Sequence, residues 1–196
     1  MTAEPTQPRQ PGRDGAIEAL IKAARELFAE RGPSAVSLRD IARRAGVNHG
    51  LIHHYIGSRN DLLRLVFTVS MDQARAEVEG SETAAAGLGA LRNLGQGSNE
   101  YTRLLAWALL EGHDPAAFHG RSSALDAIVG ASDNDSRQLR VALAMAMVQT
   151  LGWKLFGSYV VAAAGLDAEA DDAVRRDVEA LVDRIVTEAA AGERAR

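Results

Sequence analysis

The sequence predicts an all-α protein, and three observations support this prediction. Of its 196 residues 46% are hydrophobic but only 5% are aromatic, and Ala and Leu are abundant. Apolar residues recur at helical intervals along most of the chain, with few of the alternations typical of strands. The length allows one or two small domains with a buried core.

The N-terminal segment and the first helix differ sharply in composition. Three of the five prolines fall within the first twelve residues, which predicts a disordered arm over residues 1–13. A broad apolar stripe then predicts a helix over residues 14–31, with Ile17, Ile21 and Phe28 among its members. Gly32 and Pro33 end this helix.

Three helix starts follow, each with a capping residue. Ser37, Asn48 and Ser58 predict helices over residues 38–45, 49–55 and 59–79. Asp40 and Asp61 stand at the third helical position after a serine cap, where negative charge is favourable. Because Asp is shorter than Glu or Gln, we expect this favourable charge but no reciprocal hydrogen bond.

The spacing between the second and third helices is typical of a helix-turn-helix. Ala42 allows the two helices to cross closely, and Gly46 supplies the positive φ of the turn. We expect four side chains in this region to point inward: Ile41, Val47, Ile52 and Tyr55. The pattern indicates a DNA-binding domain over residues 14–58.

Charge is divided unevenly along the chain. Residues 1–66 carry 10 Lys and Arg against 7 Asp and Glu, whereas the remainder carries 12 against 19. The net charge of −4 therefore conceals a weakly basic head on an acidic body. This division suits a protein whose one end approaches phosphates.

The remaining sequence predicts a connecting helix and a helical body. We expect a connecting helix over residues 59–79, a body over residues 80–191 and a short tail over 192–196. Residues 80–97 predict only a weak helix, because they contain many glycines. Firmer helices are expected over residues 99–112, 114–129, 137–166 and 169–190.

The last two predicted helices indicate a homodimer. Their apolar surfaces exceed what one body of this size can cover, and a monomer would hold only half of a two-fold DNA site. The apolar run 141–153 has 13 residues without a charge, short of the ~18 to 20 that cross a bilayer. With no cysteine and no secretory signal, we expect a cytoplasmic protein without a membrane partner.

Residues 14–67 resemble the N-terminal domain of the tetracycline-repressor (TetR) family of bacterial transcription regulators. The resemblance lies in LFAERG at 27–32, VSLRDIARRAGV at 36–47 and HHYIGSRNDLL at 53–63. The segment RLLAWALLEGHDP at 103–115 also resembles one found in many members. The resemblance implies a ligand-binding body whose last two helices form the dimer interface.

The same resemblance implies DNA contacts. Base edges would be met by Arg39, His49, Gly50 and His53, and phosphates by Ser37, His54, Tyr55 and Arg59. Arg43 and Arg44 would add positive charge, and the caps Asn48 and Ser58 complete the predicted surface. The chain departs from the family pattern at Leu51, often Thr or Ser, at His53, usually Tyr, and at Arg59, usually Lys.

Two alternatives for the histidines are less favoured. His49 and His53 lie four residues apart, a spacing that can bind zinc. No Glu follows His49 and the chain has no cysteine, so neither a protease HExxH motif nor a thiolate site is available. The histidines could also be surface imidazoles without a function.

A set of large or adaptable side chains on the body helices predicts an apolar pocket for a small molecule, although core packing explains each residue individually. The predicted pocket residues are Tyr101, Trp107, His113, Phe118, Met145, Gln149 and Trp153. The expected function is a repressor released from a palindromic operator by a small, mainly apolar effector, with no cofactor. The alternatives are a regulator without a ligand and a helical enzyme, which is disfavoured because no nucleophile with its base, carboxylate pair or phosphate loop is found.

Overall fold

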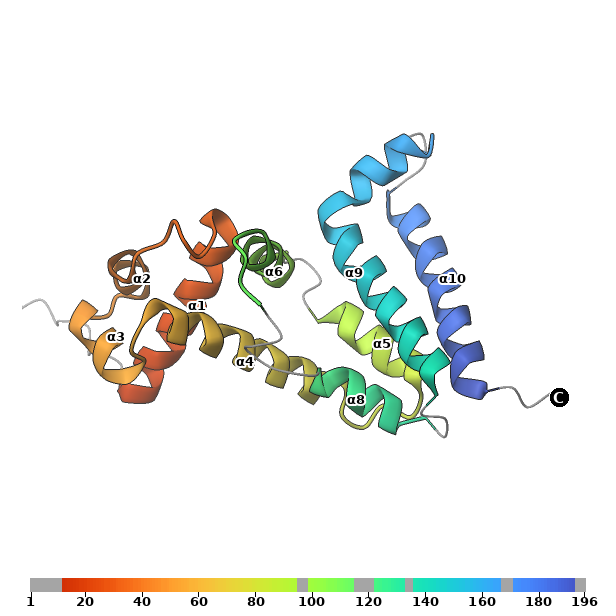
Figure 1. Ribbon diagram of the computed structural model, residues 1–196, viewed down its shortest axis with the longest axis horizontal. Coiled ribbons are helices and arrows are strands. Elements are labelled where there is room, and N and C mark those ends of the chain that lie inside the picture. The colour runs from red at the N-terminus through yellow and green to blue at the C-terminus, as the bar shows by residue number, and fades with distance from the viewer. Residues whose placement is uncertain (1–11, 95–98, 115–121, 133–135, 167–170, 193–196) are drawn as a thin grey trace, which may run out of the picture.

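The computed structural model describes residues 12–94, 99–114, 122–132, 136–166 and 171–192, and all regular structure there is helical. The predicted all-α class is confirmed. The helices run from one end of the molecule, where α1, α2 and α3 gather, to the other, where α9 and α10 lie side by side (Figure 1). Their bounds are α1 Arg13–Arg31, α2 Leu38–Ala45, α3 His49–Tyr55, α4 Arg59–Val78, α5 Ala84–Asn93, α6 Glu100–Leu110, α8 Ser123–Gly130, α9 Arg137–Ala163 and α10 Asp171–Ala191.

The head is built on the crossing of α1, α2 and α3. Ile41 and Ile52 are fully buried, and they pack with Leu20, Phe28 and Phe67 in one apolar cluster. Val47 and Tyr55, also expected to point inward, are only half-buried. Gly46 has φ +67° at the end of α2, the left-handed conformation that the turn requires.

The caps of α2 and α4 are stronger than the sequence predicted. Ser37 and Ser58 accept from the backbone N–H groups of Asp40 and Asp61, and both aspartates accept in return from the serine backbone N–H, at 3.2 and 2.9 Å. The expectation that Asp is too short for this reciprocal bond was wrong. Each serine hydroxyl also contacts the same carboxylate, which brings the shorter side chain close enough to close the capping box.

The body contains a second apolar cluster, centred on α5, α8, α9 and α10. Ile128, Leu139 and Val186 are fully buried in it. The glycine-rich segment forms a regular helix, α5, where only a weak one was expected. Gly87 has a packing reason, because a Cβ there would lie 2.7 Å from the side chain of Ile128. The expected start of the next helix at Asp114-Pro115 lies at the edge of the described residues, and α8 begins at Ser123.

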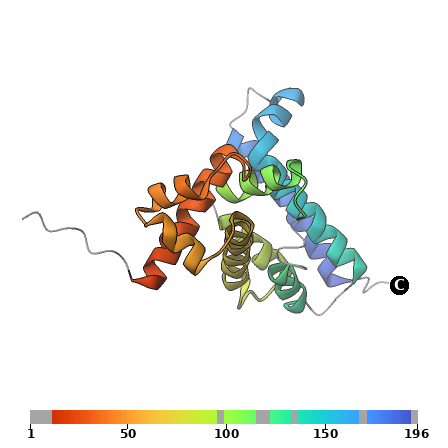
Figure 2. The same cartoon turned by 60° about the vertical axis from the view of Figure 1, so that its left-hand side comes forward.

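Helix α4 connects the two clusters. Its first half contributes Leu62, Leu63 and Phe67 to the head, and its second half contributes Ala74 and Val78 to the body. Figures 1 and 2 both show it running from the head to the body as one continuous helix. A movement of the body that displaces α4 would therefore also move the head.

Helix α6 lies within the body in sequence but packs into the head. Leu104 and Ala108 are fully buried in the same cluster as Ile41 and Phe28. Arg103 Nε donates to the carbonyl oxygen of Ala29 on α1 at 3.0 Å. The hydrophobic core of the head is thus completed by a helix that the sequence assigned to the body.

Helix α9 is 27 residues long and apolar enough, by length and composition, to span a membrane. The sequence contains Lys154 within it, and only 22% of its most apolar window is buried in the described structure. The core helix of a soluble protein can have the same length and composition. An exposed apolar helix does, however, require a partner surface of some kind.

Candidate nucleic-acid interface

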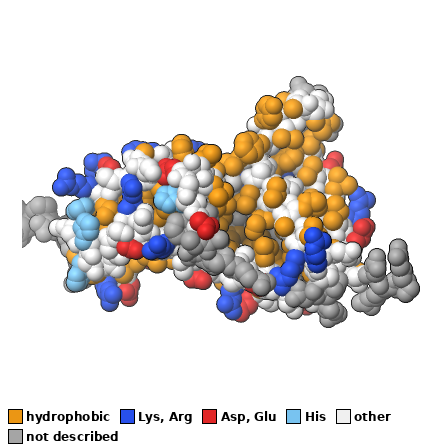
Figure 3. Space-filling view, in the orientation of Figure 1, with side chains coloured by type: hydrophobic (Ala, Val, Ile, Leu, Met, Phe, Trp, Pro, Cys, Tyr) orange, Lys and Arg blue, Asp and Glu red, His pale blue; other side chains and the backbone are white. Residues whose placement is uncertain are grey.

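Helix α3 presents a polar face at the end of the head. The side chain of Asn48 accepts from the backbone N–H of Gly50 at 2.9 Å, which fixes the first turn. Ile52 anchors the helix in the core, whereas Gly50, His53 and His54 are exposed. Figure 3 shows histidine and basic side chains gathered at this end of the molecule.

Two of the predicted base contacts are in mutual contact. The rings of His49 and His53 meet edge to face with their centroids 5.3 Å apart. This contact places both imidazoles together on one side of α3, with His53 exposed and His49 half-buried. The helix is seven residues long and contains no Lys, Arg, Asp or Glu, so the predicted base contacts would be made by imidazole and backbone groups.

The three arginines of α2 differ in their surroundings. Arg39 is exposed, and so is Arg43 although it pairs with Asp40 at 2.5 Å. Arg44 instead bridges to Glu26 and Glu30 of α1 at 3.0 and 3.5 Å. These hydrogen bonds raise the pKa of Arg44 above its usual value. Arg44 ties α2 to α1, while Arg39 is free to meet DNA.

The predicted phosphate contacts include two serines that cap helices. The hydroxyls of Ser37 and Ser58 are already engaged in the caps, at the N-termini of α2 and α4. Each N-terminus carries a positive partial charge that suits a phosphate. The adjoining aspartates Asp40 and Asp61 have a lowered pKa, chiefly because the serine side chains donate to them, so they are charged at neutral pH.

Tyr55 and Arg59 complete the flank of this surface. The Arg13 guanidinium lies 5.8 Å from the Tyr55 ring centroid, a cation–π distance, and the His54 ring lies 5.1 Å from the same ring. Arg59 Nη1 donates to the carbonyl oxygen of Ser34 at 3.1 Å. Arg13, which the sequence placed in the disordered arm, therefore adds a basic group to the predicted phosphate face.

A metal site at the histidines gains no support. Within the part of the chain that the structure describes, no group of three or more His, Cys, Asp or Glu side chains comes together. His49 and His53 would have to bind an ion as a pair, short of the four ligands of a structural zinc site.

The predicted pocket residues do not come together as one site. Tyr101 packs edge to face on Phe67 in the head cluster, and its burial raises its pKa. Trp107 lies against Gly32, and His113 lies 3.6 Å from the Glu111 carboxylate. Met145 is exposed, and Phe118 lies outside the described residues.

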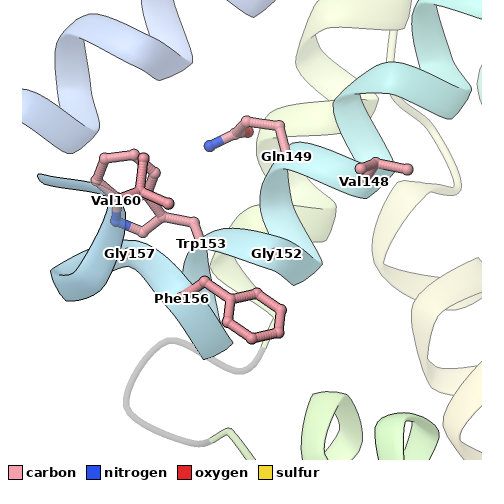
Figure 4. Close-up of a pocket in the computed structure, with 7 residues that line it drawn as sticks. All are labelled: Val148, Gln149, Gly152, Trp153, Phe156, Gly157 and Val160. Atoms are coloured by element: carbon pink, nitrogen blue, oxygen red, sulfur yellow. The ribbon is translucent and has the colours of Figure 1, made fainter. Parts of the chain in front are cut away.

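Gln149 and Trp153 do line a hollow of about 200 Å³ on α9 (Figure 4). Its other lining residues are Val148, Gly152, Phe156, Gly157 and Val160. All seven belong to α9, so the hollow is a surface depression along one helix rather than an enclosed cavity in the body. Gln149 is its one polar side chain.

Comparison with known proteins follows the same division between head and body. Residues 20–66 match the family model described as bacterial regulatory proteins, tetR family. A helix-turn-helix transcriptional repressor of Mycobacterium tuberculosis strain H37Rv is 33% identical over 193 residues, which cover 95% of this chain and 98% of the relative. The head is therefore matched as a family domain, and the body is matched along nearly its whole length by a repressor.

Solved structures agree with the fold. A TetR-family regulator from Streptomyces coelicolor is 26% identical, with a TM-score of 0.52 over 93% of this chain and 100% of that one. GusR from Salmonella enterica has a TM-score of 0.64 at 13% identity, over 92% of this chain and all of its own. The second similarity is one of fold alone.

Proposed function

Because the chain belongs to the TetR family of helix-turn-helix transcription regulators, we propose that it is a repressor that holds a palindromic operator as a homodimer and is released by a small, mainly apolar effector. The family is one of DNA-binding regulators, not of enzymes. Such a regulator acts where the genome lies, so we place it in the cytoplasm. The observation that carries the proposal is the exposed apolar face of α9 and α10.

The dimer part of the proposal rests on that face. Nine of the twelve large hydrophobic side chains exposed in the described structure lie on these two helices: Val141, Met145, Val148, Leu155, Phe156, Tyr159, Val160, Leu181 and Ile185. Figure 3 shows apolar side chains spread over the α9 end of the molecule. A patch of this extent on a soluble protein marks an interaction surface. A second copy is the partner that a two-fold operator requires.

A dimer also explains the length of α9 without a membrane. Three residues of its exposed face, Val148, Phe156 and Val160, also line the hollow. A partner helix packed there would bury this face. The substitution Val148→Asp would then place a charge inside the interface while leaving the fold of each protomer unchanged, because the side chain is 72% exposed in the single chain.

Sedimentation equilibrium, which measures the mass of the assembly in solution, tests the dimer. The wild-type chain is expected as a dimer and Val148→Asp as a monomer with weakened DNA binding. Thr68→Asp, on an exposed position of α4, introduces the same charge outside the face and should stay dimeric. A monomeric wild-type chain that still binds palindromic DNA at one protein per half-site would contradict the proposal, and partition into lipid vesicles would favour a membrane role for α9.

The effector part of the proposal rests on the hollow beside Gln149 and Trp153, which a partner packed on α9 would enclose between the two protomers. One amide among apolar groups suits a ligand with a single polar group. An effector that binds only one arrangement of the two bodies would displace α4 in each protomer. The two α3 helices would then no longer have the ~34 to 36 Å spacing that successive major grooves require. A preference of several kcal/mol for the released arrangement is needed, which apolar burial can supply.

A second candidate, a regulator without an effector, is favoured by the size of the hollow. Its volume of about 200 Å³ is below the ~300 to 1,000 Å³ of most ligand sites. The chain has two tryptophans, so Trp107→Phe leaves Trp153 as a reporter at the hollow. Quenching of its fluorescence by decanoate, together with release of bound DNA, would support the effector. Unchanged fluorescence and DNA affinity across a panel of such compounds would favour the second candidate.

A further inference from the structure

The loop between α1 and α2 is held by the C-terminal end of α6. Gly32 has φ +82°, and a Cβ there would lie 2.6 Å from Glu111 Oε1 and 3.1 Å from the Trp107 ring. Glycine is therefore required at this position both by the backbone and by the approach of α6. The loop that precedes the helix-turn-helix lies directly against a helix of the body sequence.

Glu111 makes the polar contacts of this junction. The backbone N–H of Ser34 donates to both carboxylate oxygens, at 3.2 and 3.0 Å, and the Ser34 hydroxyl donates to Oε2 at 2.8 Å. The Glu111 side chain is 17% exposed, so water competes weakly for these bonds. Hydrogen bonds to a charged acceptor are about twice as strong as neutral ones.

The position of Glu111 is unfavourable for α6 itself. It is the residue that ends the helix, and its backbone N–H donates to the carbonyl of Trp107. A negative side chain at a helix C-terminus opposes the helix dipole. Besides the nearby His113 Nε2, 3.6 Å away, the carboxylate has its hydrogen bonds with Ser34, across the junction.

Ser34 also contacts Arg59, which belongs to the predicted DNA-binding surface. Its carbonyl oxygen accepts from Arg59 Nη1 at 3.1 Å, and Arg59 is the first residue of α4, directly after the recognition helix. An arginine has five N–H donors, so this bond leaves others for a phosphate. A chain of hydrogen bonds therefore runs from α6 through the loop to a predicted phosphate contact.

We propose that Glu111 is a positioning residue for DNA binding, which fixes the Gly32–Ser34 loop and through it orients Arg59 before DNA arrives. Without the carboxylate, Ser34 loses its hydrogen bonds to Glu111, and the carbonyl that accepts from Arg59 is no longer held in place. Ordering the loop and Arg59 then costs conformational entropy when DNA binds. The inference rests on DNA binding by the head and assigns a role to a side chain outside it.

The test is a double-mutant cycle on DNA affinity. A duplex selected from random sequence by the wild-type chain serves as the probe, and binding is followed by fluorescence anisotropy. Glu111→Gln is expected to weaken binding about tenfold, which corresponds to about 1.4 kcal/mol. In an Arg59→Ala background the same change should have little further effect, because Glu111 acts through Arg59. Glu77→Gln, which removes an exposed charge on α4, is the matched control and should leave affinity unchanged.

A purely structural role predicts a different result. In the described structure Glu111 and Arg59 each contact Ser34 but not each other, so a general loss of stability would weaken both backgrounds equally. Equal losses in the two backgrounds, or unchanged affinity of Glu111→Gln, would overturn the proposal. If circular dichroism shows that Glu111→Gln does not fold, Ser34→Ala decides: it should weaken binding in the wild-type background alone. A wild-type chain that selects no DNA at all would instead defeat DNA binding by the head.

Discussion

Replacement of Leu104 by alanine is expected to destabilise the head, although Leu104 lies on a body helix. The side chain is fully buried in the cluster formed by α1 to α4. Truncation of a buried leucine removes its transfer free energy and leaves a cavity, at a cost of about 2 to 5 kcal/mol. For a chain of this length that cost lowers the melting temperature by about 4 to 20 °C. The melting curve is read from the helical circular dichroism at fixed protein concentration, because a dimer melts in a concentration-dependent way.

Leu110→Ala is the matched control on the same helix. Its side chain is 81% exposed, so little apolar area returns to water and the melting temperature should change by at most about 2 °C. If Leu104→Ala has the same melting temperature as Leu110→Ala and the wild type, then α6 does not belong to the core of the head. That result would also remove the basis for transmission through Glu111.

Three further predictions concern the DNA surface and its supports. Arg39→Ala should relax sequence preference at one base pair by about 1 to 3 kcal/mol, measured against single-base variants of the selected duplex; normal discrimination would contradict the assignment of Arg39. Arg59→Ala should instead weaken all sequences alike and reduce the slope of log affinity against log salt by about 1, which a salt titration checks. Asp40 and Asp61 have a folded pKa below the usual 3.8, so the stability they contribute is present above pH 3.8 and is lost as the pH falls through their lower folded values. Acid titration of the melting temperature should therefore be shallower in the double variant Asp40→Asn and Asp61→Asn than in the wild type.

The head could be predicted from the sequence because its determinants are local. Ser37, Asn48 and Ser58 mark helix starts by capping, and Gly46 marks the turn, with contacts that lie within a few residues. The all-α class and the family are confirmed for the same reason. The reciprocal bonds of Asp40 and Asp61 were missed, because side-chain length alone ignores how closely the serine hydroxyl draws the carboxylate in.

The body was less predictable because its contacts are distant in sequence. Tyr101 and Trp107 are large side chains on a helix, a pattern shared by pocket and core, and the structure packs both against the head. Periodicity shows which face of α6 is apolar but not which apolar surface it meets. The Glu111–Ser34 contact spans 77 positions, and no local pattern marks it.

The most direct test of the account is selection of bound duplexes from random sequence at low ionic strength. Insertion of α3 from each protomer of a dimer predicts an enriched palindrome whose half-site centres lie about 10 to 10.5 base pairs apart or at multiples of that spacing. Enrichment should disappear when Arg39 and His49 are both replaced by alanine. Selection of an unpaired half-site, or no selection of duplex DNA by the wild-type chain, would contradict the claim that paired α3 helices read the major groove.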